Sequence, residues 1–116
     1  MTKQKLTRIN GRTCRAWVQE RVPFKNSNGQ LYGQWERENT SALYVVYSYG
    51  QHWPLFAYDN DRGLWFENSD KFSRTTSKHR MQAHPLCDTL KLNCQRMIEL
   101  IRDGYVATTV RRLTNG

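Results

Sequence analysis

The apolar pattern of the chain is that of a β-sheet protein. In the run ALYVVYSY, residues 42–49, alternate residues such as Leu43, Val45 and Tyr47 fall on one face of an extended strand. The residues between them are also apolar or aromatic, except for Ser48. A strand that is apolar on both faces lies inside a sheet rather than at its edge, so this run predicts a central strand.

Shorter runs of β-forming residues flank this strand and are separated by turn sequences. Asn28-Gly29 is suited to the positive φ of a hairpin turn, and residues 60–63, which read NDRG, form a second turn signal. The sequence therefore predicts an antiparallel meander with further strands at 12–24, 31–36, 53–59 and 64–67.

The C-terminal part of the chain changes to helical periodicity. Asp88 is a suitable N-cap for a helix that runs to about Asp103, with Gly104 as the residue after the helix. Residues 105–110, YVATTV, can form a last short strand. The apolar residues of the helix recur at a spacing near 3.6 and form the face expected to pack on the sheet: Leu90, Cys94, Met97, Ile98 and Ile101.

These elements together predict an α+β fold, in which one C-terminal helix packs across a twisted antiparallel sheet of five to six strands. A chain of 116 residues fits one domain, which we assign to residues 12–116. Residues 1–11 are polar and basic, so we expect them to form a mobile arm.

Targeting signals and metal motifs are not visible in the sequence. No stretch approaches the roughly 18 apolar residues of a membrane-spanning helix, and the N-terminus lacks the apolar core of a secretory signal. We therefore expect a cytoplasmic protein without a membrane partner, and the odd number of cysteines favours reduced thiols. The spacing of the possible zinc ligands matches no common pattern, so we expect no metal and no cofactor: His79, His84, Cys87 and Cys94.

The net charge of +8 is unevenly distributed. Residues 1–19 carry five basic side chains and no acidic one, and residues 71–87 carry four basic side chains and no acidic one. Arg111 and Arg112 add a third basic segment near the C-terminus. If the fold brings these segments together, they form a surface that attracts polyanions. If it scatters them, they only keep the protein in solution.

The stretch NSDKFSRTTSKHRMQAHP, residues 68–85, is the candidate binding site. It has no sustained apolar period, and we expect Thr75 or Thr76 to cap a helix of about two turns that ends before His84. Hydroxyl and cationic groups on its first turn suit phosphate oxygens, whereas the alternative is a solvated loop whose hydroxyls satisfy its own backbone. The residues assigned to nucleic-acid binding are Lys71, Ser73, Arg74, Thr75, Thr76, Ser77, Lys78, His79, Arg80 and Gln82.

Two further groups of residues suggest additional chemistry. His79 and His84 could act as general acid and base in phosphodiester cleavage, but no acidic residue lies between Asp70 and Asp88 to orient them, so the sequence favours binding over catalysis. Tyr49, His52 and Trp53 could stack on unpaired bases. The alternative for these rings is burial in the core, and we expect His52 and Trp53, beside a turn, to be exposed.

The segments YVVYSYG, HWPLFAYD and WFENSDKFSRTTSKHRMQAHP together resemble a family of small uncharacterised proteins encoded mainly by bacteriophages. The resemblance covers roughly residues 43–85. It implies the cytoplasm of an infected bacterium as the setting and carries no particular activity. Small phage proteins in that setting commonly bind nucleic acid, or bind and disable a host protein.

The sequence therefore predicts a small phage-type protein that binds DNA or RNA, mainly through phosphate contacts from residues 68–85 and the N-terminal arm. No reading-helix motif is visible, which favours single-stranded or structured nucleic acid over sequence-specific duplex recognition. The alternative function is inhibition of an acidic host protein by the aromatic and basic surface. A metal-independent nuclease that uses His79 is a third hypothesis.

Overall fold

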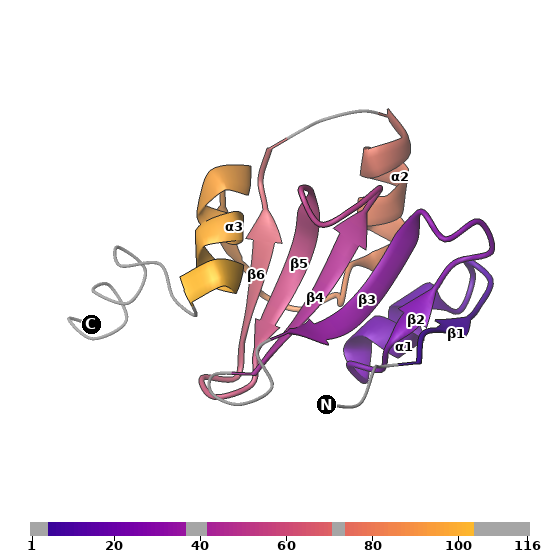
Figure 1. Ribbon diagram of the computed structural model, residues 1–116, viewed down its shortest axis with the longest axis horizontal. Helices are drawn as coiled ribbons and strands as arrows, with labels where there is room; N and C mark the ends of the chain where they lie inside the picture. Colours follow the sequence, from indigo (N-terminus) through magenta and orange to yellow (C-terminus); the bar gives the residue numbers. More distant parts are fainter. Residues whose placement is uncertain (1–4, 37–41, 71–73, 104–116) are drawn as a thin grey trace.

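The structure is a computed structural model, which describes residues 5–36, 42–70 and 74–103 (Figure 1). The described residues form seven strands and three helices. The strands are β1 (Thr7–Arg8), β2 (Phe24–Lys25), β3 (Leu31–Glu36), β4 (Leu43–Ser48), β5 (Pro54–Asp59), β6 (Leu64–Asn68) and β7 (Leu90–Leu92). The helices are α1 (Cys14–Gln19), α2 (Arg74–Ala83) and α3 (Cys94–Asp103).

All seven strands belong to one sheet, in which they follow one another in chain order from β1 to β7. Neighbouring strands from β2 to β6 are antiparallel, which confirms the predicted meander over 31–36, 53–59 and 64–67. At both ends the sheet becomes parallel, because β1 pairs with β2 and β6 pairs with β7 in that sense. The α+β class is therefore confirmed, whereas the predicted all-antiparallel sheet of five to six strands is wrong.

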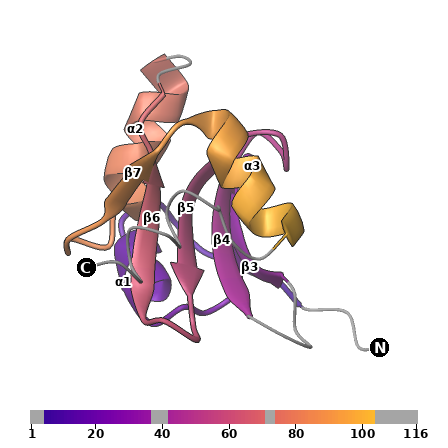
Figure 2. The same ribbon diagram turned by 90° about the vertical axis from the view of Figure 1, so that its left-hand side faces the viewer.

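The two parallel pairs explain where the helices lie. The connection from β1 to β2 contains α1, and the connection from β6 to β7 contains α2. Both connections advance in the same direction across the sheet, and parallel crossovers are almost always right-handed. Both helices must then cover the same face of the sheet, while α3 covers the other face (Figure 2). The prediction of a single helix packed across the sheet holds only for α3.

The core has one layer on each side of the sheet, and β4 contributes to both. Tyr44 and Val46 point into the layer under α1 and α2, while Val45 and Tyr47 point into the layer under α3. All six residues of β4 are buried. The prediction of a central strand over residues 42–49 is confirmed for Leu43–Ser48, whereas Tyr49, with a φ of 66°, lies outside the strand.

The strand expected over residues 12–24 is wrong for most of its length. Cys14 to Gln19 form α1, and only Phe24 and Lys25 pair with β3. Cys14 and Val18 are both buried, and their separation of four residues places them on one face of a helix. The same two residues also fit the alternation of a strand, so the pattern was ambiguous over such a short segment.

The expected mobile arm is wrong for the residues around β1. The backbone N–H of Ile9 donates a hydrogen bond of 2.8 Å to the carbonyl of Lys25, and the Ile9 side chain is only 8% exposed. Residues 7–9 are therefore part of the folded sheet edge. The sequence does not reveal this strand, because two residues are too few to produce a hydrophobic periodicity and most of the neighbouring residues are polar.

The predicted start of the C-terminal helix is also wrong. Residues 90–92 form β7 beside β6, and α3 begins at Cys94 rather than after Asp88. Asn93 Oδ1 accepts a hydrogen bond from the backbone N–H of Arg96, and Asp70 Oδ2 accepts one from that of Cys94. These two side chains satisfy N–H groups that the first turn of a helix leaves without partners. Gly104 and the strand expected at 105–110 lie outside the described residues.

Candidate nucleic-acid interface

Helix α2 carries most of the basic stretch and divides it into two faces. Thr76, His79 and Ala83 are buried, while Lys78 and Met81 are among the exposed residues. The helix ends before His84, as predicted. It already includes Arg74, however, so the expectation that Thr75 or Thr76 caps it is wrong. Lys71 and Ser73 lie outside the described residues, and the exposed part of the predicted set is Arg74, Thr75, Ser77 and Lys78.

The buried face of α2 is held to the sheet by polar contacts at the end of β4. His79 Nδ1 and Ser48 Oγ lie 2.8 Å apart, and the hydroxyl of Thr76 lies 3.4 Å from the same Ser48 oxygen. Burial lowers the pKa of His79, and the neighbouring charge of Lys78 lowers it further. Thr76 and His79 were assigned to phosphate binding from the sequence, but their side chains instead fix the orientation of the helix.

The aromatic residues predicted to stack on bases lie in different environments. Tyr49 is 41% exposed, adopts a φ of 66° and places its ring 5.5 Å from that of His79. His52 is exposed, as expected. Trp53 is half-buried and packs against the core layer under α1 and α2, so the expectation that it is exposed is wrong.

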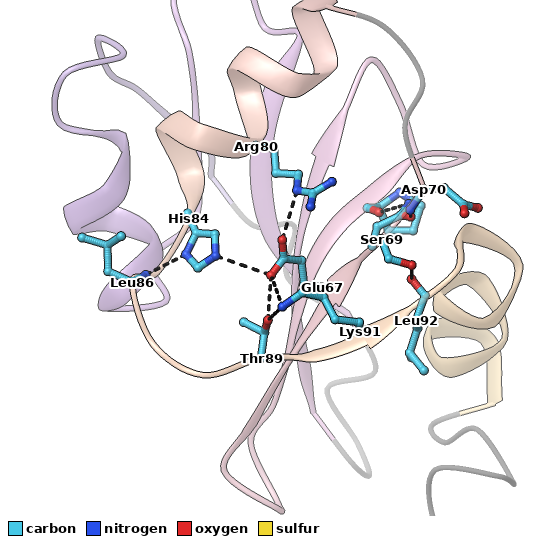
Figure 3. Close-up of polar contacts among 11 residues, drawn as sticks. Glu67, Ser69, Asp70, Arg80, His84, Leu86, Thr89, Lys91 and Leu92 are labelled. Atoms are coloured by element: carbon cyan, nitrogen blue, oxygen red, sulfur yellow. Dashed lines mark hydrogen bonds and ion pairs between the residues drawn. The ribbon is translucent and has the colours of Figure 1, made fainter.

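A buried carboxylate, that of Glu67 on β6, organises the C-terminal half of the basic stretch (Figure 3). Its side chain is 3% exposed, and Arg80 Nε donates to Oε2 at 3.0 Å. Its other oxygen accepts a hydrogen bond of 2.6 Å from the hydroxyl of Thr89 and lies 3.2 Å from Lys91 Nζ. Burial alone raises the pKa of Glu67, but these hydrogen bonds and the charges of Lys91 and Arg80 outweigh it and lower the pKa.

His84 belongs to the same cluster. Its Nδ1 accepts a hydrogen bond of 2.9 Å from the backbone N–H of Leu86, which places the hydrogen of a neutral imidazole on Nε2. Nε2 faces Glu67 Oε1 at 3.4 Å. Glu67, which directly precedes the stretch 68–85, is therefore the acidic partner of His84. An acidic residue directly after the apolar run Leu64-Trp65-Phe66 is a sequence signal for a buried, partnered carboxylate.

The C-terminal end of α2 is fixed by α1. Arg15 donates hydrogen bonds from Nη2 to the carbonyl of Met81 and from Nε to that of His84, at 2.6 and 2.8 Å. Gln19 donates a hydrogen bond of 3.0 Å to the carbonyl of Pro85. Such contacts satisfy carbonyl groups that a helix end leaves without intrahelical partners. Arg15 thus joins the two helices, although the sequence suggested only that it was one of several positive charges.

The remaining cations of this face are oriented toward solvent. Arg74 and Lys78 are one turn apart on α2, and Arg12, in the segment before α1, lines a cleft together with Gln82 of α2. None of these three cations forms an ion pair with any residue in the described ranges. Residues 12–20 and 74–83 together contain five basic side chains and one acidic one, Glu20. The fold thus brings two distant basic segments into one layer.

Other basic residues lie elsewhere in the molecule. Arg96 and Arg102 belong to α3, on the opposite face of the sheet, and Lys91 belongs to the edge strand β7. Arg111 and Arg112 lie outside the described residues. The convergence expected from the sequence therefore applies to the segments around α1 and α2, but not to every basic residue.

The described residues show no group of three or more histidine, cysteine or acidic side chains that could hold a metal ion. The two histidines among the possible zinc ligands have different partners: His79 contacts Ser48, and His84 faces Glu67. No helix within the described ranges is long and apolar enough to cross a lipid bilayer.

Comparisons with known proteins add no functional assignment. No protein-family model, no curated protein and no solved structure matches the chain. The proposals below therefore rest on the geometry and electrostatics of the α1–α2 face.

Proposed function

We propose that the protein binds nucleic acid through phosphate contacts made by the exposed side of α2 and the adjoining start of α1. The observation that carries this proposal is the side-chain composition of that surface: Arg74, Thr75, Ser77 and Lys78 are exposed on a helix without any acidic residue. Guanidinium, ammonium and hydroxyl groups are the side chains that most often contact phosphate oxygens. Following the sequence resemblance, the proposed setting is a bacterium infected by a phage.

The buried contacts of α2 support this role because they fix the helix that presents the cations. The Ser48–His79 and Glu67–Arg80 contacts attach one side of α2 to β4 and β6, and Arg15 attaches its end to α1. A cation on a fixed helix loses less conformational freedom on binding than one on a free loop. Arg80 is expected to contribute less to phosphate binding than the sequence suggests, because its Nε already donates a hydrogen bond to Glu67.

Binding of a fluorescently labelled single-stranded oligonucleotide, measured by anisotropy over a range of salt concentrations, tests the proposal. The affinity of the wild-type protein should fall linearly with salt on logarithmic axes. Arg74→Gln and Lys78→Gln should each weaken binding and reduce the magnitude of the salt slope by about 1, the value for one lost phosphate contact.

Arg96→Gln is the matched control, because Arg96 is also an exposed arginine on a helix but belongs to α3 on the opposite face. It changes the net charge by the same amount and should leave the salt slope unchanged. Equal effects of Arg74→Gln and Arg96→Gln would show that only the net charge matters, and would contradict a binding surface on α2.

The alternative function, inhibition of an acidic host protein, is favoured by one observation. Met81 and Leu86 are the most exposed of the large apolar side chains in the described ranges, at 73% and 64%, and both lie at the end of α2 that α1 contacts. Exposed apolar side chains beside cations suit a protein partner. A host protein that is recovered from infected cells after nuclease treatment, and lost with Met81→Ser plus Leu86→Ser, would support this alternative.

A further inference from the structure

A shallow cleft of about 610 Å³, open to solvent, lies where the segment before α1 meets the C-terminal half of α2, and Asn10, Gly11, Arg12 and Gln82 line it. None of the lining residues in the described ranges carries an acidic side chain. The cleft therefore combines a positive charge with amide groups and is suited to a ligand that is both anionic and rich in hydrogen-bonding groups.

The cleft continues the basic side of α2. Arg74, Lys78 and Gln82 are spaced four residues apart, so they form one stripe along the helix. Eight residues of helix correspond to about 12 Å, which makes the stripe longer than a single nucleotide step. A nucleic-acid strand whose phosphates contact Arg74 and Lys78 in turn therefore reaches Gln82 and the cleft.

The lining groups can recognise a nucleobase. Gln82 carries both a donor and an acceptor in one amide, the combination that pairs with base edges. The side chain of Asn10 fixes the opposite wall, because its Oδ1 accepts hydrogen bonds from the backbone N–H groups of Arg12 and Thr13. Gly11 makes room for the Gln82 amide: a Cβ at this position would lie 3.1 Å from Gln82 Nε2.

We infer that the cleft receives an unpaired base of a single-stranded nucleic acid whose phosphates contact Arg12, Arg74 and Lys78. This inference rests on the proposed nucleic-acid binding and specifies its substrate class. A base in a duplex directs its edge toward its partner and is stacked on both sides, so it cannot enter a cleft without leaving the helix. The amide of Gln82 carries both a donor and an acceptor and can therefore pair with several base edges, which predicts weak sequence preference.

The test compares a twelve-nucleotide single strand of thymidines with an abasic strand of the same length and the same number of phosphates. The wild-type protein should bind the thymidine strand about fivefold or more tightly than the abasic strand. Gln82→Ala should remove this difference by weakening only the thymidine complex. Gln95→Ala, an exposed glutamine on α3, is the matched control and should keep the difference.

A second variant, Gln82→Glu, retains the length of the side chain and should weaken the thymidine complex further, which keeps the test decisive if Gln82→Ala does not fold. Equal binding of the two strands by the wild-type protein, or a base preference that survives in both Gln82 variants, would overturn the cleft assignment and leave phosphate binding by α2 intact. Failure of the wild-type protein to bind either strand at low salt would overturn both proposals.

Discussion

The carboxylate of Glu67 on β6 and the guanidinium of Arg80 on α2 are joined by a hydrogen bond of 3.0 Å between Oε2 and Nε. Because Glu67 also binds Thr89 and Lys91, a single side chain connects α2 to the segment that follows it (Figure 3). The stability of this corner of the fold therefore depends on one negative charge.

Glu67→Gln should destabilise the protein by about 1–3 kcal/mol, because it leaves the charge of the partly buried Arg80 without its partner. Urea unfolding followed by tryptophan fluorescence measures the change. Glu20→Gln, which removes an exposed carboxylate at the end of α1, is the control and should have little effect. Equal stability of Glu67→Gln and the wild-type protein would show that the cluster contributes nothing.

The lowered pKa of Glu67 also predicts the pH dependence of stability. A carboxyl group that ionises more readily in the folded than in the unfolded protein stabilises the fold above its ordinary pKa of 4.5. That contribution is lost as the pH falls through the lowered pKa. The free energy of unfolding of the wild-type protein should thus fall more steeply below pH 4.5 than that of Glu67→Gln. Parallel curves for the two proteins would contradict the assignment.

His79 should titrate below its ordinary pKa of 6.5, because burial and the charge of Lys78 both disfavour the imidazolium. Its contribution to stability is then complete above pH 6.5 and is lost as the pH falls toward the lowered value. NMR titration of the imidazole measures the pKa directly. Lys78→Gln should raise the pKa of His79 toward 6.5, whereas Arg96→Gln on the opposite face should not. A His79 pKa above 6.5 in the wild-type protein would contradict this prediction.

Arg12 and Arg15 should have separate roles although they are close in the sequence, Arg12 before α1 and Arg15 within it. Arg15→Gln should lower the free energy of unfolding by about 1–2 kcal/mol, because the carbonyls of Met81 and His84 lose a charged donor. Hydrogen exchange at the end of α2 should become faster. Arg12→Gln should leave both measurements unchanged and weaken oligonucleotide binding. The reverse pattern would show that the two arginines had been assigned to the wrong functions.

The meander could be predicted from the sequence because alternation within a strand and turn residues between strands are local signals. The alternation in residues 42–49 and the turn at Asn28-Gly29, where Gly29 has a φ of 75°, both persist in the fold. The strands β1 and β7 could not be predicted in the same way. Each has two or three residues and exists because a neighbouring strand is already in place, which no periodicity records.

The candidate site could be predicted only as a region. The composition of residues 68–85 located a basic helix, but not which of its groups are used inside the protein. That distinction depends on two strand residues outside the stretch, Ser48 of β4 and Glu67 of β6. They contact Thr76, His79, Arg80 and His84 inside the protein. The contribution of Arg12 was equally hidden, because it follows from the crossover geometry that places α1 beside α2.

The order of the strands in the sheet affects the folding pathway. Since each strand lies beside its sequence neighbour, the hairpins from β3 to β6 need only short loops to close, and low sequence separation favours rapid folding. The outer strands β1 and β7 can pair only after the connections that contain α1 and α2 have formed. We therefore expect the hairpins to serve as the nucleus and the proposed binding surface on α1 and α2 to form last.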